Sequence, residues 1–198
     1  PNSPSGTVCP LGQVAELAAA ASGLVVLDEA YVDFAEGDCL GLLGRFDNVI
    51  ILRSFSKSFS LAGVRVGYGL ASAEIVAGLL KVKDSYNVNR FAIAAGVAAL
   101  DDAAYMRANA ARIRSERERL AAGLSALGLK VLPSQANFVA AICGEPGPQA
   151  IARALEEAGI LVRTFSDPSL ADWVRITVGT PEQNDRLLEC LENFLRSR

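Results

Sequence analysis

Short apolar runs and helical stripes alternate along the first hundred residues. The unbroken apolar runs at 24–27 and 49–52 predict two strands of a parallel sheet that are covered on both faces. Residues 66–70 predict another strand, and Ser72 is placed to cap the helix that follows. The Ala-rich stretch 91–100 is apolar nearly all round a helix, so we expect that helix to be buried. This part of the chain therefore has an α/β pattern.

The second half opens with a long helical stripe. Apolar residues recur at spacings of 7, 7, 4 and 3, which predicts one helix over about 103–127 that joins two domains. The stripe consists of Met106, Ile113, Leu120, Leu124 and Leu127. Four arginines of this helix are interleaved with glutamates, so we interpret them as a solvated helix face. Strands are then predicted at 130–132, 137–142, 160–163 and 173–178, with helices that begin at Pro148 and Pro181.

These later elements follow the order β-β-α-β-β-α, which predicts a small α+β domain over residues 106–198. Residues 1–105 would belong to the other domain. The last helix has the clearest start signal, because Thr180 and Gln183 have the spacing of a capping box around Pro181.

The composition restricts the class of protein. The chain has 198 residues, 51% of them hydrophobic, and its net charge of −3 gives no basic surface for nucleic acid. Its apolar runs are shorter than a membrane span. The four cysteines form no CxxC pair and no signal peptide is visible, so we expect reduced thiols and a cytoplasmic location. Histidine is absent, which excludes histidine-based triads and metal sites.

Candidate chemistry gathers where the predicted strands end. Lys57 stands among serines after the run at 49–52, and Arg65 follows eight positions later, which indicates an anion site. We expect the lysine to be partly desolvated, which makes an amine a better nucleophile toward carbonyls. The alternative is a solvated lysine in a polar loop. Asp28 ends the first strand, so it could face the same crevice as Lys57, or it could only cap a helix.

Four short segments, taken in order, resemble motifs of the fold-type I aminotransferases, which use pyridoxal 5'-phosphate (PLP). They are PNSPSG at 1–6, DEAY at 28–31, SFSK at 54–57 and GVRVGY at 63–68. Ser3 and Ser5 depart from the commoner Asn and Thr of the first motif. Other segments look most like the histidinol-phosphate aminotransferase subgroup, namely YNVN at 86–89, SQANF at 134–138, GILVR at 159–163 and VRITVGT at 174–180. The resemblance runs from Pro1 to the C-terminus.

The resemblance implies a cofactor site for PLP. Lys57 would bind the cofactor covalently and move a proton between the substrate and the cofactor. Asp28 would pair with the pyridine nitrogen, so that the ring can accept negative charge. The residues that the resemblance assigns to the cofactor are Asn2, Asp28, Tyr31, Ser54, Ser56, Lys57 and Arg65, the last of which would hold the phosphate together with the two serines.

The resemblance also implies a substrate site in the second half. Arg175 would bind the carboxylate of the amino donor, and Arg163 and Arg175 together would bind the phosphate of histidinol phosphate. The residues alone favour the alternative, two surface arginines at strand ends. Asn137 would lie near the substrate, or it could be a buried asparagine that satisfies a strand end. Tyr86 would contact the substrate.

A transaminase of histidinol phosphate with 2-oxoglutarate, acting in histidine biosynthesis as a homodimer, is the function that the resemblance implies. Its fold would be part of the three-layer α/β/α large domain with a mostly parallel sheet, followed by the small α+β domain. The chain looks like the C-terminal portion of such an enzyme, with little or no activity alone. The alternatives are a threonine-phosphate decarboxylase-like lyase and an inactive truncated product. We expect no nucleic-acid partner and no membrane association.

Overall fold

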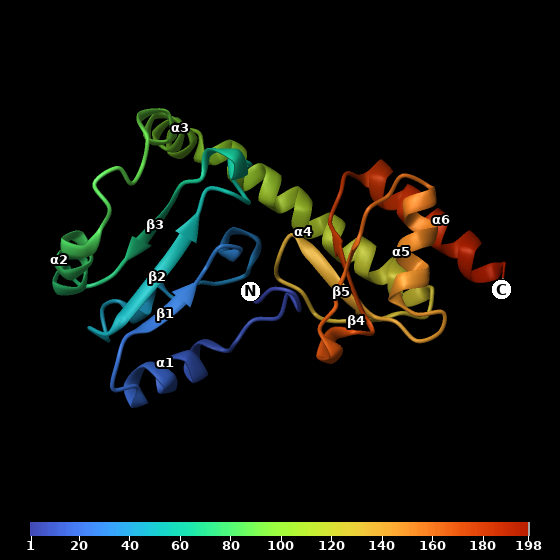
Figure 1. The fold of residues 1–198 in the computed structure, drawn as a ribbon, viewed down its shortest axis with the longest axis horizontal. Coiled ribbons are helices and arrows are strands. Elements are labelled where there is room, and N and C mark those ends of the chain that lie inside the picture. The colour runs from blue at the N-terminus through green and yellow to red at the C-terminus, as the bar shows by residue number, and fades with distance from the viewer. Residues whose placement is uncertain (198) are drawn as a thin grey trace. The chain divides into compact units, whose positions relative to one another are not determined.

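A computed structural model describes residues 1–197, which form two compact units (Figure 1). Unit 1 contains Pro1 and Cys9–Ala110, and unit 2 contains Asn2–Val8 and the residues from Ala111 onward. The short segment Asn2–Val8 thus packs with unit 2, although the residues that follow it belong to unit 1.

Unit 1 is built on a three-stranded sheet with the order β1-β2-β3. Strand β1 (Val25–Asp28) pairs in parallel with β2 (Val49–Ser54), as their apolar patterns predict. Strand β3 (Gly67–Leu70) is antiparallel to β2, so only one of the two pairings in the described sheet is parallel. A Cβ on Gly67 would lie 2.7 Å from the carbonyl oxygen of Arg53, so a glycine is needed for this close approach.

Helices and short 3-10 turns connect and cover the strands of unit 1. The helices are α1 (Leu11–Ala20), α2 (Ala73–Val82) and α3 (Arg90–Asp101), and the 3-10 turns are η1 (Val32–Phe34), η2 (Leu40–Leu42) and η3 (Ala62–Val64). Helix α1 packs through Ala18 against Val49 and Ile51 of β2, which are fully buried. The predicted cap of α2 is confirmed, because the hydroxyl of Ser72 accepts the amide N–H of Ile75.

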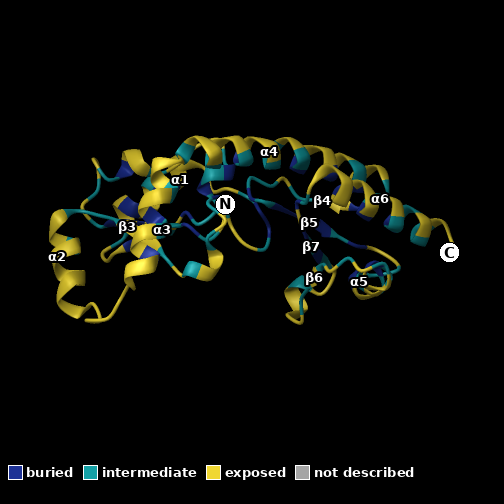
Figure 2. Cartoon of the chain, turned by 90° about the horizontal axis from the view of Figure 1, so that it is seen from above, coloured by how far each residue is buried: buried dark blue, intermediate teal, exposed yellow. Residues whose placement is uncertain are grey.

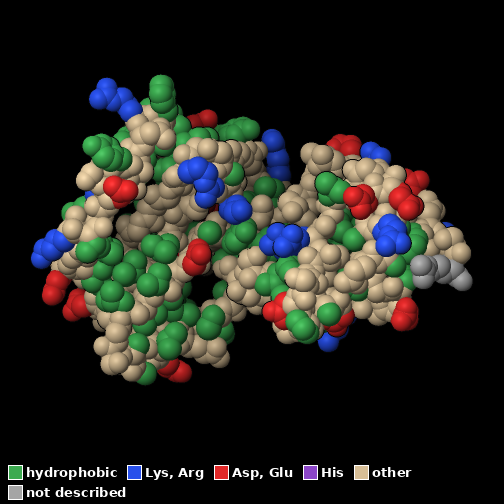
Figure 3. Space-filling model, viewed as in Figure 1, with side chains coloured by type: hydrophobic (Ala, Val, Ile, Leu, Met, Phe, Trp, Pro, Cys, Tyr) green, Lys and Arg blue, Asp and Glu red, His purple; other side chains and the backbone are tan. Residues whose placement is uncertain are grey.

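Two burial predictions for unit 1 are wrong. Helix α3 buries only its small residues Ala92 and Gly96, the second of which lies beside the Phe55 ring, while Phe91 is 89% exposed. Strand β1 is covered on one face only, since Val26 is 54% exposed. Figures 2 and 3 show the exposed α2 and α3 and the hydrophobic side chains on the visible face of unit 1. Even so, no helix within residues 1–197 has the length and apolar composition to cross a membrane.

Unit 2 is an antiparallel sheet with helices, in the predicted order of elements. Its strands are β4 (Lys130–Val131), β5 (Phe138–Ile142), β6 (Arg163–Thr164) and β7 (Trp173–Thr177), arranged β4-β5-β7-β6. Its helices are α5 (Pro148–Glu157), α6 (Pro181–Arg196) and most of α4 (Ala103–Ala126), with a 3-10 turn η4 (Pro168–Leu170). The predicted capping box is confirmed, because Thr180 and Gln183 bond reciprocally at the start of α6.

The core of unit 2 lies between the sheet and its helices. Leu120 and Leu124 of α4 are fully buried there, together with Leu191 of α6 and the inward side chains of β5 and β7. The expectation of a solvated arginine face on α4 is wrong for Arg117, which is 6% exposed and donates to the carbonyl oxygen of Ala136 at 3.0 Å. A buried backbone carbonyl at the loop before β5 requires such a donor.

Candidate active site

The carboxyl ends of β1 and β2 and the amino end of β3 lie at one edge of the unit 1 sheet. Asp28 is the last residue of β1 and stands opposite Leu52 of β2. Ser54 ends β2 and stands opposite Gly67, two residues after Arg65. The structure thus brings the loop after β1 and the loop that contains Lys57 to the same edge, as the parallel strands predict, and the antiparallel β3 adds Arg65 there.

Lys57 reaches from its loop toward the loop after β1. Its Nζ lies 5.4 Å from the centroid of the Tyr31 ring, within the range of a cation–π contact. The expected partial desolvation is wrong for the described chain, because Lys57 is exposed. The loop instead buries its neighbours Phe55 and Ser58, which are 5% and 6% exposed. The amine is therefore accessible to a ligand.

Hydroxyl and guanidinium groups lie in the same loop region as this lysine. The hydroxyl oxygen of Ser54 accepts the amide N–H of Ser56 at 3.0 Å, and both side chains are half-buried. Arg65 has a left-handed backbone with φ of 58°, and its Nη1 donates to the carbonyl oxygen of Ala62 at 2.8 Å. Among the described residues of unit 1, no carboxylate lies within 4.0 Å of the charged nitrogens of Lys57 or Arg65. Both cations thus remain available to an anion.

Asp28 is exposed and makes a local bond. Its Oδ1 accepts the amide N–H of Ala30 at 2.9 Å, which is a turn contact and not the helix cap of the alternative interpretation, since η1 follows Tyr31 and has no side-chain cap. That bond occupies one carboxylate oxygen, and an ionised carboxylate can accept several others. The side chain can therefore cap the turn and still bind a cationic N–H.

A buried ion pair that the sequence did not reveal holds the two strand ends together. Glu29, 6% exposed, accepts from Arg53 Nε at 3.0 Å, from Arg53 Nη2 at 2.8 Å and from the amide of Cys39 at 2.7 Å. Arg53 also contacts Asp38 at 3.1 Å. Although burial lowers the pKa of Arg53, the hydrogen bonds to Glu29 and Asp38 raise that pKa above its usual value. The only hint of this pair in the sequence is that Glu29 and Arg53 are charged residues next to apolar strand segments.

The remaining cofactor candidate, Asn2, belongs to unit 2. Its side chain is exposed and its Nδ2 donates to the hydroxyl of buried Ser5 at 2.9 Å, which in turn bonds Thr7 at 2.7 Å. Gly6 has φ of +78°, and a Cβ there would lie 2.2 Å from Oγ of Ser134. The turn at residues 2–7 is thereby fixed against the loop before β5.

Arg163 and Arg175 are brought together in unit 2. They stand directly opposite each other on the antiparallel strands β6 and β7, so both side chains project from the same face of the sheet. Arg175 donates from Nη1 to the hydroxyl of Ser3 at 2.9 Å, and its Cζ lies 4.9 Å from the Phe138 ring centroid. Arg163 lies over the Phe165 ring at 5.9 Å. Like charges that face each other repel, so this pair favours a bound anion.

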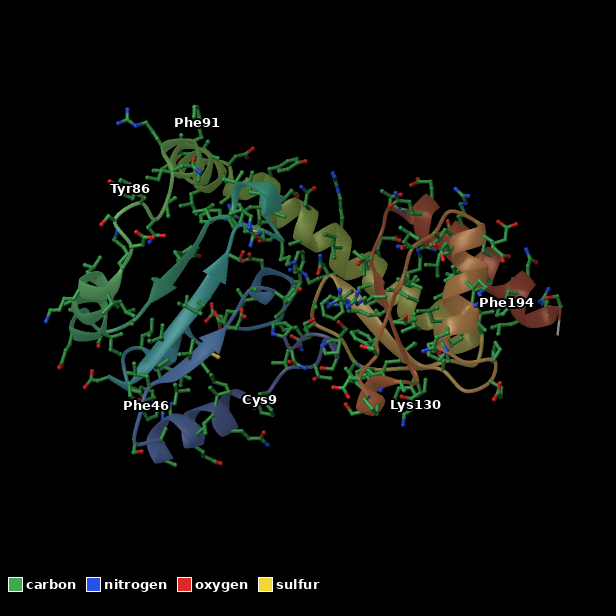
Figure 4. The ribbon with its side chains drawn as sticks, viewed as in Figure 1. Cys9, Phe46, Tyr86, Phe91, Lys130 and Phe194 are labelled. Atoms are coloured by element: carbon green, nitrogen blue, oxygen red, sulfur yellow. The ribbon has the colours of Figure 1, made fainter. Side chains whose placement is uncertain are left out.

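The other two substrate candidates do not join these groups through any described contact. Asn137 is half-buried, and its backbone carbonyl accepts the amide N–H of Val178 at 3.0 Å at the end of β7. Tyr86 is 94% exposed in the loop between α2 and α3, where Figure 4 labels it, and its amide donates to Asp84.

The fold and these motifs define a class of protein. The profile of the family described as aminotransferase class I and II matches residues 1–191, and the chain belongs to that family. Its α/β fold also matches aminotransferase structures.

Individual relatives are more specific. Histidinol-phosphate aminotransferase 1 from Nostoc sp. is 46% identical over 198 residues, which are 100% of this chain and 56% of that protein. The structure of histidinol-phosphate aminotransferase from Sinorhizobium meliloti in complex with pyridoxal-5'-phosphate matches with a TM-score of 0.89 and 33% identity over 100% of this chain and 56% of that one. L-threonine-O-3-phosphate decarboxylase from Porphyromonas gingivalis matches with a TM-score of 0.87 and 26% identity over 99% and 62% of the two chains. The chain spans about half the length of the curated relatives it matches.

Proposed function

We propose that this chain carries the lysine, the anion-binding arginines and part of the cofactor site of a PLP-dependent histidinol-phosphate aminotransferase. The observation that carries the proposal is the Lys57 amine 5.4 Å from the Tyr31 ring, at the sheet edge that Asp28 and Arg65 share. The identity of 46% with the Nostoc enzyme supports the choice of substrate. The reaction moves an amino group between histidinol phosphate and 2-oxoglutarate, giving imidazole acetol phosphate and glutamate.

The side chains at this edge have the chemistry that PLP requires. PLP, when bound, supplies an aldehyde that condenses with amines and a protonated ring that accepts electron density from the substrate. The exposed amine of Lys57 suits the aldehyde, and the carboxylate of Asp28 suits a protonated ring nitrogen. Tyr31 would supply a donor for the phenolic oxygen of PLP, and Asn2, which lies in unit 2, stays a candidate for the same oxygen by resemblance alone. Ser54, Ser56 and Arg65 would supply hydroxyl and guanidinium donors for a phosphate.

Lys57 would also carry the proton in the reaction. Its amine would take the proton from the α-carbon of the substrate and would donate a proton on the cofactor side, at C4', which is two bonds from that carbon. The absence of histidine from the chain is consistent with a lysine in this role. Arg65 would keep the cofactor in place during the transfer by holding its phosphate.

Arg175 and Arg163 would bind the anionic ends of two chemically different substrates. The two residues stand opposite each other on β6 and β7, and within the described part of unit 2 neither has a carboxylate within 4.0 Å. A carboxylate of glutamate or a phosphate of histidinol phosphate would relieve their repulsion. Asn137 and Tyr86 are kept as secondary candidates for contacts with the substrate.

The proposal extends to the architecture and the assembly. Residues 1–105 would be part of a three-layer PLP-binding domain, and residues 106–198 would be the small domain. We propose a homodimer, and the exposed apolar side chains Phe91, Ile93 and Val97 of α3 are available for contacts with other protein surfaces. A cytoplasmic location and free thiols complete the proposal, since the described cysteines form no disulfide.

A decarboxylase is the second candidate, because the Porphyromonas threonine-phosphate decarboxylase matches with a TM-score of 0.87. The test supplies PLP with histidinol phosphate or threonine phosphate, with and without 2-oxoglutarate. Glutamate formed only when histidinol phosphate and the keto acid are both present supports the transaminase. Carbon dioxide released from threonine phosphate without a keto acid supports the lyase. Neither product, with PLP attached to Lys57, supports a cofactor-binding portion that is inactive alone.

A further inference from the structure

The loop that contains Lys57 is fixed at two points beside the lysine. On one side Phe55 is buried, with its ring 4.9 Å from the Phe59 ring and 5.6 Å from the Tyr68 ring. On the other side Ser58 is buried and only 6% exposed. Backbone bonds close the turn between them, from the amide of Leu61 to the carbonyl of Phe55 at 3.0 Å and from Ser60 to Lys57 at 3.1 Å. The exposed lysine thus stands on a firmly packed turn.

The buried hydroxyl of Ser58 donates to Oδ2 of Asp33, which lies 25 positions earlier in η1. This bond connects the loop after β2 with the loop after β1. A buried hydroxyl without an acceptor would be costly, so Ser58 depends on Asp33. Hydrogen bonds between a hydroxyl and a carboxylate group are among the shorter and stronger ones in proteins. The pair therefore fixes the relative position of the two loops.

Two side-chain contacts join the loop after β2 to the loop after β1. Lys57 reaches Tyr31, with Nζ 5.4 Å from the ring centroid, and its neighbour Ser58 reaches Asp33, two residues after Tyr31. The lysine side chain has many rotamers and is exposed, so its own packing holds it weakly. The adjacent buried bond is the contact that places its backbone opposite Tyr31.

We infer that Ser58 and Asp33 are a positioning pair, whose hydrogen bond holds the amine of Lys57 beside Tyr31 at the place where a cofactor aldehyde would be attacked. The inference rests on the proposed function for its purpose, although the pair itself is a property of the loops. Neither residue touches the reacting atoms. Loss of the bond should let the lysine leave the Tyr31 ring, without removing any group that binds the cofactor.

A cofactor-free measurement tests the position. The chain has four lysines, Lys57, Lys81, Lys83 and Lys130, so reductive ¹³C-methylation gives few lysine signals, and Lys57→Arg assigns the one from Lys57. In an NMR spectrum, we expect the ring current of Tyr31 to give the Lys57 methyl signal a chemical shift that differs from those of the other three lysines. In Ser58→Ala and Asp33→Ala, the chemical shift of Lys57 should approach the values of the other lysines. In Asp33→Asn it should stay unchanged, because the amide oxygen of the asparagine still accepts the hydroxyl proton of Ser58. Ser85→Ala, at an exposed serine outside the Lys57 loop, is the matched control.

A second measurement tests the consequence for the cofactor. PLP is mixed with the unmethylated chain, samples are quenched with borohydride over time, and modified Lys57 is counted by peptide mapping. The amine and the aldehyde lose one water, and borohydride then delivers hydride to the carbon while the nitrogen takes a proton from water. We expect attachment to slow roughly tenfold in Ser58→Ala and in Asp33→Ala. The double variant should be no slower than the slower single variant, because the same bond between Ser58 and Asp33 is lost in all three.

The outcomes separate the two proposals. A Lys57 methyl signal that does not move in the variants overturns the positioning pair, and so does a moved signal with an unchanged attachment rate. Effects that multiply in the double variant also overturn it. If the unchanged chain attaches no PLP at Lys57, the proposed function fails, and the methyl signal alone then decides the position. If Ser58→Ala does not fold, the comparison of Asp33→Ala with Asp33→Asn gives the answer without altering the buried serine.

Discussion

Glu29 holds the ends of β1 and β2 together, and its removal tests how the candidate site is supported. Glu29→Ala removes an acceptor of two bonds from Arg53, at 3.0 and 2.8 Å, and of one from the amide of Cys39, at 2.7 Å. The side chain of Arg53 is 16% exposed, and after the substitution its remaining ion-pair partner is Asp38, at 3.1 Å, which is more exposed than Glu29. A largely buried positive charge thus loses its best partner.

The magnitude follows from the burial of the pair. Removal of one partner from a buried ion pair costs about 3–5 kcal/mol. Because Arg53 keeps Asp38 and some contact with water, we expect the free energy of unfolding of unit 1 to fall by about 3 kcal/mol, near the lower end. Asp38→Ala removes the exposed carboxylate from the same guanidinium, and an exposed pair contributes about 0.2–1 kcal/mol. The two variants should therefore differ by about 2 kcal/mol or more.

Urea unfolding at pH 7, followed by circular dichroism, measures this difference. Trp173 is the only tryptophan and lies in β7 of unit 2, so its fluorescence provides an internal reference for the other unit. We expect Glu29→Ala to shift the circular dichroism transition more than the fluorescence transition. A Glu29→Ala variant that is no less stable than Asp38→Ala would refute the reasoning.

Three other predictions concern the turn of unit 2, a thiol and the arginine pair. Gly6→Ala should lower the free energy of unfolding of unit 2 in urea by at least about 1 kcal/mol, because φ is +78° and the new Cβ would lie 2.2 Å from Oγ of Ser134. Burial, and then the charge of Glu29, raise the pKa of Cys39 from 9.0 to about 11. The native thiol therefore stays protonated where an unfolded thiol ionises, so its contribution to stability falls as the pH rises from 9.0 toward 11, and alkylation by iodoacetamide at pH 9 should be slow. Arg163→Gln removes a like charge opposite Arg175, so the free energy of unfolding should stay the same or rise by up to about 1 kcal/mol. Titration calorimetry of the same variant should show weaker binding of phosphate.

Each of these predictions has a matched control. Gly63→Ala, where an added Cβ meets nothing within 4 Å, should cost less than Gly6→Ala, and equal costs would contradict the steric argument. The exposed Cys9 should be alkylated first, and equal rates at Cys39 would contradict its raised pKa. Arg153→Gln changes a charge outside the arginine pair, and an equal loss of phosphate affinity would remove Arg163 from the anion site.

The strands and the main helices could be predicted because their signals are local. The apolar runs that precede Asp28 and Ser54 required parallel neighbours, and the capping residues of α6 marked its start. The burial of α3 could not be predicted from its composition, because an apolar surface is buried only where another element covers it. Phenylalanine is usually a core residue, yet Phe91 is 89% exposed.

The candidate site was predictable as a set of residues but not as an arrangement. That Arg163 and Arg175 stand opposite each other depends on the strand order β5-β7-β6, which no spacing along the chain encodes. The bond from Ser58 to Asp33 depends on the shapes of two loops that are 25 residues apart. Resemblance supplied the residues and their proposed roles, whereas the supporting contacts required coordinates.

Whether PLP attaches to Lys57 is the most direct test of the proposed function. The chain is incubated with PLP, reduced with borohydride, digested and mapped by mass spectrometry, with Lys57→Arg as the control. The proposal predicts one major pyridoxyl modification, on Lys57, that is lost in the control while the chain stays folded. Modification spread over Lys81, Lys83 and Lys130 in proportion to their exposure, or no modification at Lys57, would contradict it.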